Sequence, residues 1–432
     1  MMEFQAVVMA AGTASRMREV TSGIPKCLLP IGNVPLIASC LNILKKAGFS
    51  EALIIVRENE KTKIQTAVEK FNMKLDFVAI PKNEDWGTGD SLRYIKDKIK
   101  SHVIILSCDI ISDFSLKKML NYHHSRSSSL TVLLVPFLKS LKDAEVPGSK
   151  KKCKFERDII AMNSEKKLIL INSEADFEET VPFKLNILEQ NSEVKVHSNF
   201  MDSHVYIIRK DLVDFIIVNE HISTLKGEFL PAAVKKQFQG RKFHKPHPCD
   251  AQLGCDLNEN FNLKNIAIDL TTSKCSTKTE ELICFAYIDK KCFCTRVNTV
   301  VAFADINKKI SKNFSLMGVE YVKSHQFLKS QVDADSVLGE NCELLTKSSV
   351  KQTSMGSNCK LDEKAKITNS IIMDNVIFGK GCVIQNCIIC SGVVFEDNCS
   401  LKNSIIGPDQ TIQTLTKLNN EILHGSDSLM EI

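Results

Sequence analysis

The chain has 432 residues, a length that predicts two or three domains at about 150 residues each. Hydrophobic residues make up 44% of the chain and charged residues 25%, which excludes a disordered chain, a collagen and a coiled-coil rod. The formal net charge is +5, too small for this length to indicate a nucleic-acid or anionic-membrane partner. Because no apolar run approaches the ~18 residues of a membrane helix, we expect no membrane-spanning segment.

The N-terminus and the cysteines favour a cytosolic protein. The first residues, MMEFQAVVMAAG, lack a basic region, and their short apolar run belongs to a predicted strand, so we expect no signal peptide. The 16 cysteines are scattered, and several stand where a small buried residue is expected. This usage is typical of free thiols in a reducing compartment.

The first half of the chain alternates predicted strands with predicted helices. Short apolar runs predict strands over residues 4–9, 52–56, 75–80, 103–107 and 130–135. Apolar residues at helical spacing predict helices over 36–47, 64–71 and 92–99, the first of them stopped by Gly48. This alternation indicates an α/β domain with a mostly parallel sheet between helices. Ligands bind beyond the carboxyl ends of such strands, so we expect the functional loops there.

The last quarter of the chain contains a 17-residue repeat. Blocks begin at Val350, Ile367, Ile384 and Leu401, the motif N-[SC]-I-I recurs in three of them, and residues 333–349 form a weaker fifth copy. Aliphatic positions step by six, five and six residues, and a small residue often follows four positions later. This spacing predicts a left-handed parallel β-helix whose coils stabilise one another. The predicted core residues include Leu338, Leu344, Leu361, Ile367, Phe378, Ile384, Phe395 and Leu401.

The β-helix carries no residue suited to acyl transfer. Left-handed β-helices often belong to acyltransferases, which use a histidine of the coil as a base. No histidine lies between Asp333 and Lys417, so we interpret this domain as an assembly surface.

The predicted organisation has four parts: a nucleotide-binding-type domain over 1–238, a polar linker or insertion over 239–280, a connecting segment over 281–332, and the β-helix with a C-terminal cap over 333–432. The linker contains His244, His247, Cys249 and Cys255 within twelve residues. Imidazole and thiolate groups are zinc ligands, but this spacing matches no strong zinc pattern, so metal binding there stays open.

Candidate phosphate-binding residues follow the first predicted strand. Gly12 and Arg16 lie in the small-residue loop AAGTASRM, which can bring backbone N–H groups to a phosphate and supply a positive charge. Downstream, Lys26 can reach a triphosphate, and Gly87 can let a base approach the backbone. Asp109, at a predicted strand end, can hold Mg²⁺.

These segments, in this order, resemble the nucleotidyltransferase domain of sugar-nucleotide pyrophosphorylases. The chain also resembles, in more of its segments, the gamma-type subunits of eukaryotic translation initiation factor 2B. The resemblance is carried by the segments that begin at Phe4, Ile24, Gly87, Leu106, Ser223, Cys294 and Leu429. The resemblance covers nearly the whole chain and is weakest over residues 239–280. It implies a Rossmann-like nucleotidyltransferase domain with a mostly parallel mixed sheet, followed by the left-handed β-helix.

The chain departs from active pyrophosphorylases at residues that their chemistry needs. Ala14 and Ser15 stand where those enzymes usually have glycine and threonine, and Cys27 replaces the second proline of their P-K-P-L motif. Their E-K-P sugar-site segment has no clear counterpart. Many of them place a second metal aspartate in a W-x-D-x-G segment, whereas the single tryptophan here is Trp86. Asp109 alone is a poor Mg²⁺ site.

The resemblance therefore implies a vestigial nucleotide pocket with no catalytic residue, no metal and no cofactor. It implies a non-catalytic subunit of the factor 2B complex that pairs with the epsilon subunit and supports GDP/GTP exchange on initiation factor 2, without contacting nucleic acid or membrane. The epsilon subunit carries an additional C-terminal helical exchange domain, which we do not expect here because the sequence ends at Ile432. The alternative is an active sugar-1-phosphate nucleotidyltransferase that uses Lys26 and Asp109 for in-line attack on a nucleoside triphosphate.

Overall fold

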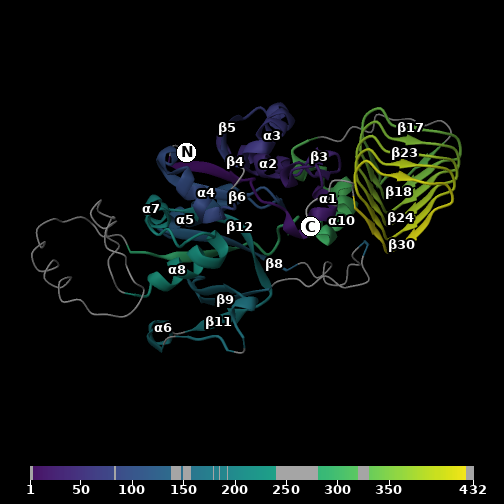
Figure 1. Ribbon diagram of the computed structural model, residues 1–432. Helices are drawn as coiled ribbons and strands as arrows, with labels where there is room; N and C mark the ends of the chain where they lie inside the picture. The colour runs from purple at the N-terminus through teal and green to yellow at the C-terminus, as the bar shows by residue number, and fades with distance from the viewer. Residues whose placement is uncertain are drawn as a thin grey trace, which may run out of the picture.

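The computed structural model describes residues 3–81, 84–137, 147–148, 157–178, 180–183, 185–191, 193–239, 281–319 and 330–424. An N-terminal α/β region lies beside a C-terminal stack of short strands, and helices α1 (Arg18–Thr21) and α10 (Val300–Lys309) lie where the two meet (Figure 1). The candidate zinc ligands in 239–280 lie outside the described residues. The predicted C-terminal cap is the segment after Lys417; its residues 418–424 are described and contribute to strands of the stack, and its residues 425–432 lie outside the description.

A seven-stranded mixed sheet forms the centre of the N-terminal region. Its order is β13 (Cys284–Ile288), β8 (Leu130–Pro136), β12 (Phe200–Ile208), β6 (His102–Ser107), β1 (Phe4–Met9), β4 (Glu51–Arg57) and β5 (Lys74–Ile80). Strands β6, β1, β4 and β5 are parallel, β12 is antiparallel to both of its neighbours, and β13 is parallel to β8. The predicted α/β class with a mostly parallel mixed sheet is confirmed, and each of the five predicted strands is present.

Helices cover both faces of this sheet because successive strand residues are buried on opposite sides. Val7 and Ile55 face one apolar cluster, and Val8 and Ile54 face another. The first cluster is covered by α4 (Thr88–Tyr94), α7 (Lys210–Val218) and α8 (Leu230–Lys236). The second is covered by α2 (Ile37–Ala47), α3 (Lys61–Val68) and α5 (Leu116–Ser125). As predicted, Gly48 ends the helix over 37–47, with a left-handed φ of 91°.

Three smaller sheets complete the N-terminal region. The antiparallel strands β10 (Leu168–Ser173), β9 (Asp158–Asn163) and β11 (Val194–His197) form one sheet beside α6 (Leu185–Gln190). Strand β7 (Ile110–Ser112) pairs with β14 (Cys294–Arg296), and β2 (Pro30–Ile31) pairs with β3 (Val34–Pro35). The β7–β14 pair joins segments that lie more than 180 residues apart in sequence, and it brings the connecting segment close to the carboxyl end of β6.

The C-terminal stack is a left-handed β-helix made of three parallel sheets, as the repeat predicts. The first sheet contains β15 (Gln331–Val332), β18 (Ser349–Lys351), β21 (Lys366–Thr368), β24 (Val383–Gln385), β27 (Ser400–Lys402) and β30 (Lys417–Asn419). The second contains β16 (Val337–Leu338), β19 (Ser354–Met355), β22 (Ile371–Ile372), β25 (Ile388–Ile389), β28 (Ile405–Ile406) and β31 (Ile422–Leu423). The third contains β17 (Glu343–Leu344), β20 (Lys360–Leu361), β23 (Ile377–Phe378), β26 (Val394–Phe395) and β29 (Thr411–Ile412). Residues paired between neighbouring coils of the second and third sheets are 17 positions apart, as Leu361 and Phe378 are.

The interior of the β-helix is an apolar column. Leu361, Phe378 and Phe395 lie on successive coils, each about 1% exposed, and the two phenylalanine rings stack with centroids 4.9 Å apart. The same cluster contains the other predicted core residues: Leu338, Ile367, Ile384, Leu401 and, only partly buried, Leu344. The small residues that follow include Cys359 and Cys382, which are fully buried. The described cysteines are free thiols, and all but Cys292 are buried.

Each position of the N-[SC]-I-I motif has its own structural reason. The asparagines 369, 386 and 403 turn the corner in the left-handed conformation, and their side-chain amides bond from coil to coil at 2.8–3.1 Å. The next residue is small and buried, as Cys387 shows. The second isoleucine, such as Ile389, points into the coil, and the first, such as Ile388, points out of it.

The outward isoleucines attach the β-helix to the N-terminal region. Ile371, Ile388 and Ile405 are 1–3% exposed and share one apolar cluster with residues of the N-terminal region and of α10 (Val300–Lys309). That cluster includes Met17, Val20, Ile31 and Phe303. The second β-helix sheet is therefore buried against the N-terminal region, whereas the first and third sheets carry exposed side chains such as Lys360 and Lys402. None of the described helices is long and apolar enough to cross a membrane.

Candidate functional site

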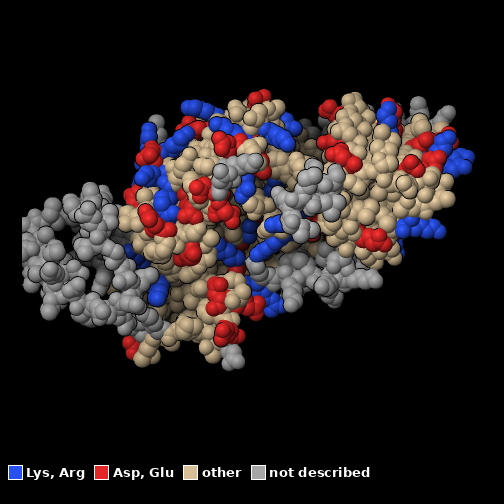
Figure 2. Space-filling view, viewed as in Figure 1, with Lys and Arg blue, Asp and Glu red and all other residues tan. Residues whose placement is uncertain are grey.

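An open cavity of about 490 Å³ lies beyond the carboxyl ends of β1 and β4, where the parallel sheet predicts a ligand site. Its lining combines the first loop, the start of α4, and residues of β12 and the segment before α8. The lining includes Gly12, Thr13, Arg57, Trp86, Gly87, Thr88, His204, Thr224 and Lys226. Basic and acidic side chains are interspersed over the visible face of this region (Figure 2). The cavity thus has mixed polarity, with Arg57 and Lys226 opposed by Asp85 and Asp176.

The first loop places Ala14 in a backbone conformation that favours glycine. Ala14 has φ 53° and ψ 35°, a left-handed conformation that glycine adopts without steric cost and alanine does not. Gly12 lines the cavity, and a Cβ built there would meet nothing within 4 Å. Arg16 lies in the short 3-10 helix Ser15–Met17, is exposed, and is not part of the lining. The loop therefore holds an alanine in a conformation that favours glycine.

Gly87 lines the cavity, and the absence of a side chain there allows close packing against Ser223. A Cβ at Gly87 would collide with the carbonyl oxygen of Ser223, and a Cβ at Gly89 would lie 2.5 Å from the carbonyl oxygen of Ile222. The Gly89 amide donates to Ser223 O at 2.6 Å. The G-T-G-D segment therefore needs glycine so that the chain over 222–224 can approach the start of α4, whatever the cavity binds.

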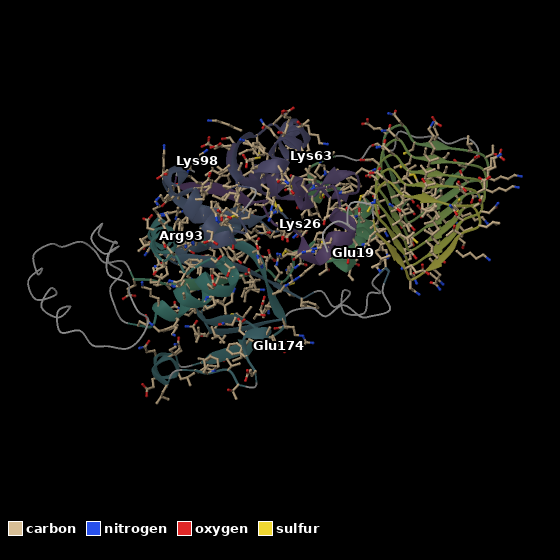
Figure 3. All side chains as sticks on the ribbon, viewed as in Figure 1. Glu19, Lys26, Lys63, Arg93, Lys98 and Glu174 are labelled. Atoms are coloured by element: carbon tan, nitrogen blue, oxygen red, sulfur yellow. The ribbon has the colours of Figure 1, made fainter. Side chains whose placement is uncertain are left out.

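Lys26 and Asp109, two of the predicted pocket residues, form an ion pair. Lys26 Nζ donates to Asp109 Oδ2 at 2.5 Å, and the Asp109 side chain is 1% exposed. Lys26 lies in the middle of the N-terminal region (Figure 3). Neither side chain is part of the cavity lining, whereas Gly12 and Gly87 are.

Asp109 has a second cationic partner, Arg296, which the sequence analysis missed. Arg296 donates from Nη2 to Asp109 Oδ2 at 3.0 Å and from Nε to Oδ1 at 3.3 Å. Burial alone would raise the pKa of Asp109, but the charges of Arg296 and Lys26 outweigh it and hold this pKa well below its usual value. The segment that begins at Cys294 was noticed only as part of the family resemblance, and nothing in its spacing marks Arg296.

A second buried ionic group lies beside the cavity and was also missed. Lys226 lies 2.8 Å from Asp158, and the Asp202 backbone N–H donates to the same carboxylate at 3.0 Å. Asp202 accepts a short hydrogen bond from Tyr206, and burial raises the pKa of Asp202 to about 6. His204 lines the cavity in the left-handed conformation, φ 56°, and burial together with Arg296 and Lys226 lowers its pKa, so its ring is neutral at pH 7.

The Mg²⁺ ion of a nucleotidyltransferase does not fit these residues. Mg²⁺ takes oxygen ligands at about 2.0–2.1 Å, usually one or two carboxylates plus phosphates and water. Both oxygens of Asp109 are already occupied by Lys26, Arg296 and Ser107, whose Oγ donates to Oδ1 at 2.7 Å. Across the part of the chain that the structure describes, no three His, Cys, Asp or Glu side chains are grouped so that they could hold a metal ion.

The fold and the site define a nucleotidyltransferase-like chain with a C-terminal left-handed β-helix. The model of the family described as "Nucleotidyl transferase" matches residues 5–142, and that of the "EIF2B subunit epsilon LbH domain" matches residues 320–418. The chain is related to the gamma subunits of translation initiation factor eIF2B, which confirms the resemblance seen in the sequence.

The similarity to these relatives extends over most of the chain. The chain is 30% identical to eIF2B subunit gamma of Caenorhabditis elegans over 246 residues, which cover 55% of this chain and 60% of that protein. It is 28% identical to subunit gamma of Dictyostelium discoideum over 379 residues, 81% of this chain and 86% of that protein. Mannose-1-phosphate guanylyltransferase 1 of Arabidopsis thaliana is more distant, at 25% identity over 136 residues, 30% of this chain and 37% of that protein.

Proposed function

We propose that the chain is a gamma-type, non-catalytic subunit of the translation initiation factor 2B complex. In this role it pairs with an epsilon subunit and supports GDP/GTP exchange on initiation factor 2 in the cytosol, without itself binding nucleic acid or membrane. The main support for a non-catalytic role is the pairing of Asp109 with Lys26 and Arg296. Nucleotidyl transfer would need this carboxylate as a metal ligand. The relatives named eIF2B subunit gamma support the assignment to this complex.

The β-helix fits an assembly role in this proposal. Its second sheet is buried against the N-terminal region, and its first and third sheets present their outward side chains to the solvent. Initiation factor 2 is large, and docking of large proteins uses wide surfaces rather than a small cavity. The chain then binds and orients the substrate, and it supplies no attacking group.

A GDP-release experiment tests the exchange role. Initiation factor 2 loaded with labelled GDP is mixed with this chain, with the epsilon subunit, or with both, and release of the label is followed. We expect this chain alone to leave GDP release at its spontaneous rate, and the pair to release GDP faster than epsilon alone. Robust release driven by this chain without epsilon contradicts the proposed supporting role.

A pyrophosphate-release experiment tests the alternative, an active sugar-1-phosphate nucleotidyltransferase. The chain is incubated with Mg²⁺, each nucleoside triphosphate, and mannose-1-phosphate or glucose-1-phosphate. We expect no pyrophosphate above the protein-free blank, because Asp109 is already paired with Lys26 and Arg296. Pyrophosphate release by the wild-type chain that disappears in Asp109→Asn establishes the alternative instead.

A further inference from the structure

The surroundings of Asp109 leave no position on its carboxylate for an added ligand. Oδ2 accepts from Lys26 Nζ at 2.5 Å and from Arg296 Nη2 at 3.0 Å. Oδ1 accepts from Ser107 Oγ at 2.7 Å and from Arg296 Nε at 3.3 Å. A carboxylate offers about four lone-pair directions, so these four contacts satisfy it completely. The guanidinium reaches both oxygens, which is the planar two-point contact that arginine makes with carboxylates.

The local charge also opposes a divalent cation. One carboxylate faces two cations, and the side chains of Lys26 and Arg296 are only 13% and 14% exposed, so water screens their charge weakly. The other buried carboxylates nearby have partners of their own. Asp158 pairs with Lys226, and Asp202 accepts from Tyr206 and from the backbone N–H of His204. A metal ion at this position would have to displace an existing cation.

Arg296 is held in place by the backbone around it. It is the last residue of β14, where it pairs with Ile110 of β7. The next residue, Val297, donates its backbone N–H to the carbonyl oxygen of Asp109 at 2.8 Å. Thr299 then caps α10, whose Phe303 packs in the apolar cluster that holds the β-helix. Arg296 thus joins the end of β6 to the segment that leads to the β-helix.

We propose that the Arg296 guanidinium stands in for the divalent cation of a nucleotidyltransferase, and that Lys26, Asp109 and Arg296 form a metal-independent ionic clasp. The clasp ties together three segments: the short 3-10 helix Lys26–Leu28, the segment that follows β6, and β14. Its positive charge is supplied by the chain itself, so the site needs no metal and admits none. This inference concerns metal binding and structure, and it does not depend on the proposed exchange role.

Binding of Mn²⁺, measured by electron paramagnetic resonance on the full chain, tests the clasp. Free hexaaqua Mn²⁺ gives a strong signal that falls when the ion binds protein. We expect the wild-type chain to bind no Mn²⁺ that depends on Asp109. Arg296→Asp, which replaces the cation by a second carboxylate beside Asp109, is expected to gain about one equivalent of bound Mn²⁺, and Arg296→Asp combined with Asp109→Asn to lose it again.

Two outcomes overturn the proposal. One is a single equivalent of Mn²⁺ bound by the wild-type chain and lost in Asp109→Asn. The other is a folded Arg296→Asp chain that binds no more Mn²⁺ than the wild type. A second measurement keeps the test decisive if Arg296→Asp does not fold: the midpoint of thermal unfolding of the wild-type chain in EDTA and in Mg²⁺. We expect no shift between them, and a Mg²⁺-dependent rise that Asp109→Asn abolishes contradicts the clasp.

Discussion

Leu361→Asp is expected to destabilise the β-helix by about 3–5 kcal/mol, whereas the neighbouring Lys360→Asp is expected to cost about 1 kcal/mol or less. The Leu361 side chain is 1% exposed and lies on the apolar column between Leu344 and Phe378. A carboxylate there has no counter-charge and no water. Lys360 points outward, is 56% exposed and pairs with Glu343 at 3.1 Å, an exposed ion pair of the kind that contributes little.

Urea unfolding of the two variants measures this difference. The pair is well matched because the same carboxylate is introduced at adjacent residues of one strand whose side chains point in opposite directions. Lys360→Asp also removes the exposed ion pair with Glu343, which contributes little. Equal destabilisation by the two substitutions means that the register of β20 is shifted by one residue, since such a slip moves every side chain to the other face.

The β-helix was predictable because its signals are local and repeated. Every coil of 17 residues carries its own corner, small residue and inward aliphatic residue, so several copies report the same pattern. The sequence did not predict that the first isoleucine of N-[SC]-I-I would be buried against the N-terminal region. Ile388 points out of the coil and is buried only because Phe303 of α10 and Met17 pack in the same cluster. Those residues are distant in sequence and follow no common period.

The α/β sheet was predictable in its parallel half and less so beyond it. Strands β1, β4 and β6 are short apolar runs that alternate with helices along the chain. This alternation is typical of an α/β fold with a parallel sheet. Strand β12 was not recognised as a strand, although it is inserted antiparallel between β6 and β8. Its residues Asp202, Ser203 and His204 interrupt the apolar run, because there the strand has a register irregularity and carries the buried ionic group.

The candidate site was predictable only where residues follow strand ends. Asp109 lies two residues beyond the end of β6, and Lys26 belongs to a recognisable motif, so their proximity was a reasonable expectation. Arg296 lies 187 residues beyond Asp109 on a strand of three residues. Gly87 could be picked out from the sequence as a candidate site residue. Its close contact with the backbone of Ser223 could not be predicted, because the two residues are distant in sequence. A sequence shows which residues can form a site, and tertiary contacts decide which partners occupy them.

Asp109→Ala is expected to destabilise the N-terminal region by about 3–5 kcal/mol, because it leaves Arg296 and Lys26 buried without their counter-charge. Asp76→Ala is the matched control. Lys98 and Asp76 are separated by 2.6 Å, close to the 2.5 Å of Lys26 and Asp109, but their side chains are 44% and 55% exposed. Lys98 lies at the edge of the N-terminal region and Lys26 in its middle (Figure 3). We expect Asp76→Ala to cost about 1 kcal/mol or less.

The pH dependence of this loss follows from the pKa of Asp109. Burial would raise this pKa, but Arg296 and Lys26 hold it well below its usual value. A carboxyl whose pKa is lowered by folding stabilises the protein above its unfolded pKa of about 3.9, and that stability is lost as the pH falls through the folded pKa. The free-energy difference between wild type and Asp109→Ala, measured by urea unfolding, should therefore be the same at pH 7 and pH 5. A loss no larger than that of Asp76→Ala, or a difference that has already shrunk at pH 5, contradicts a buried ion pair at this site.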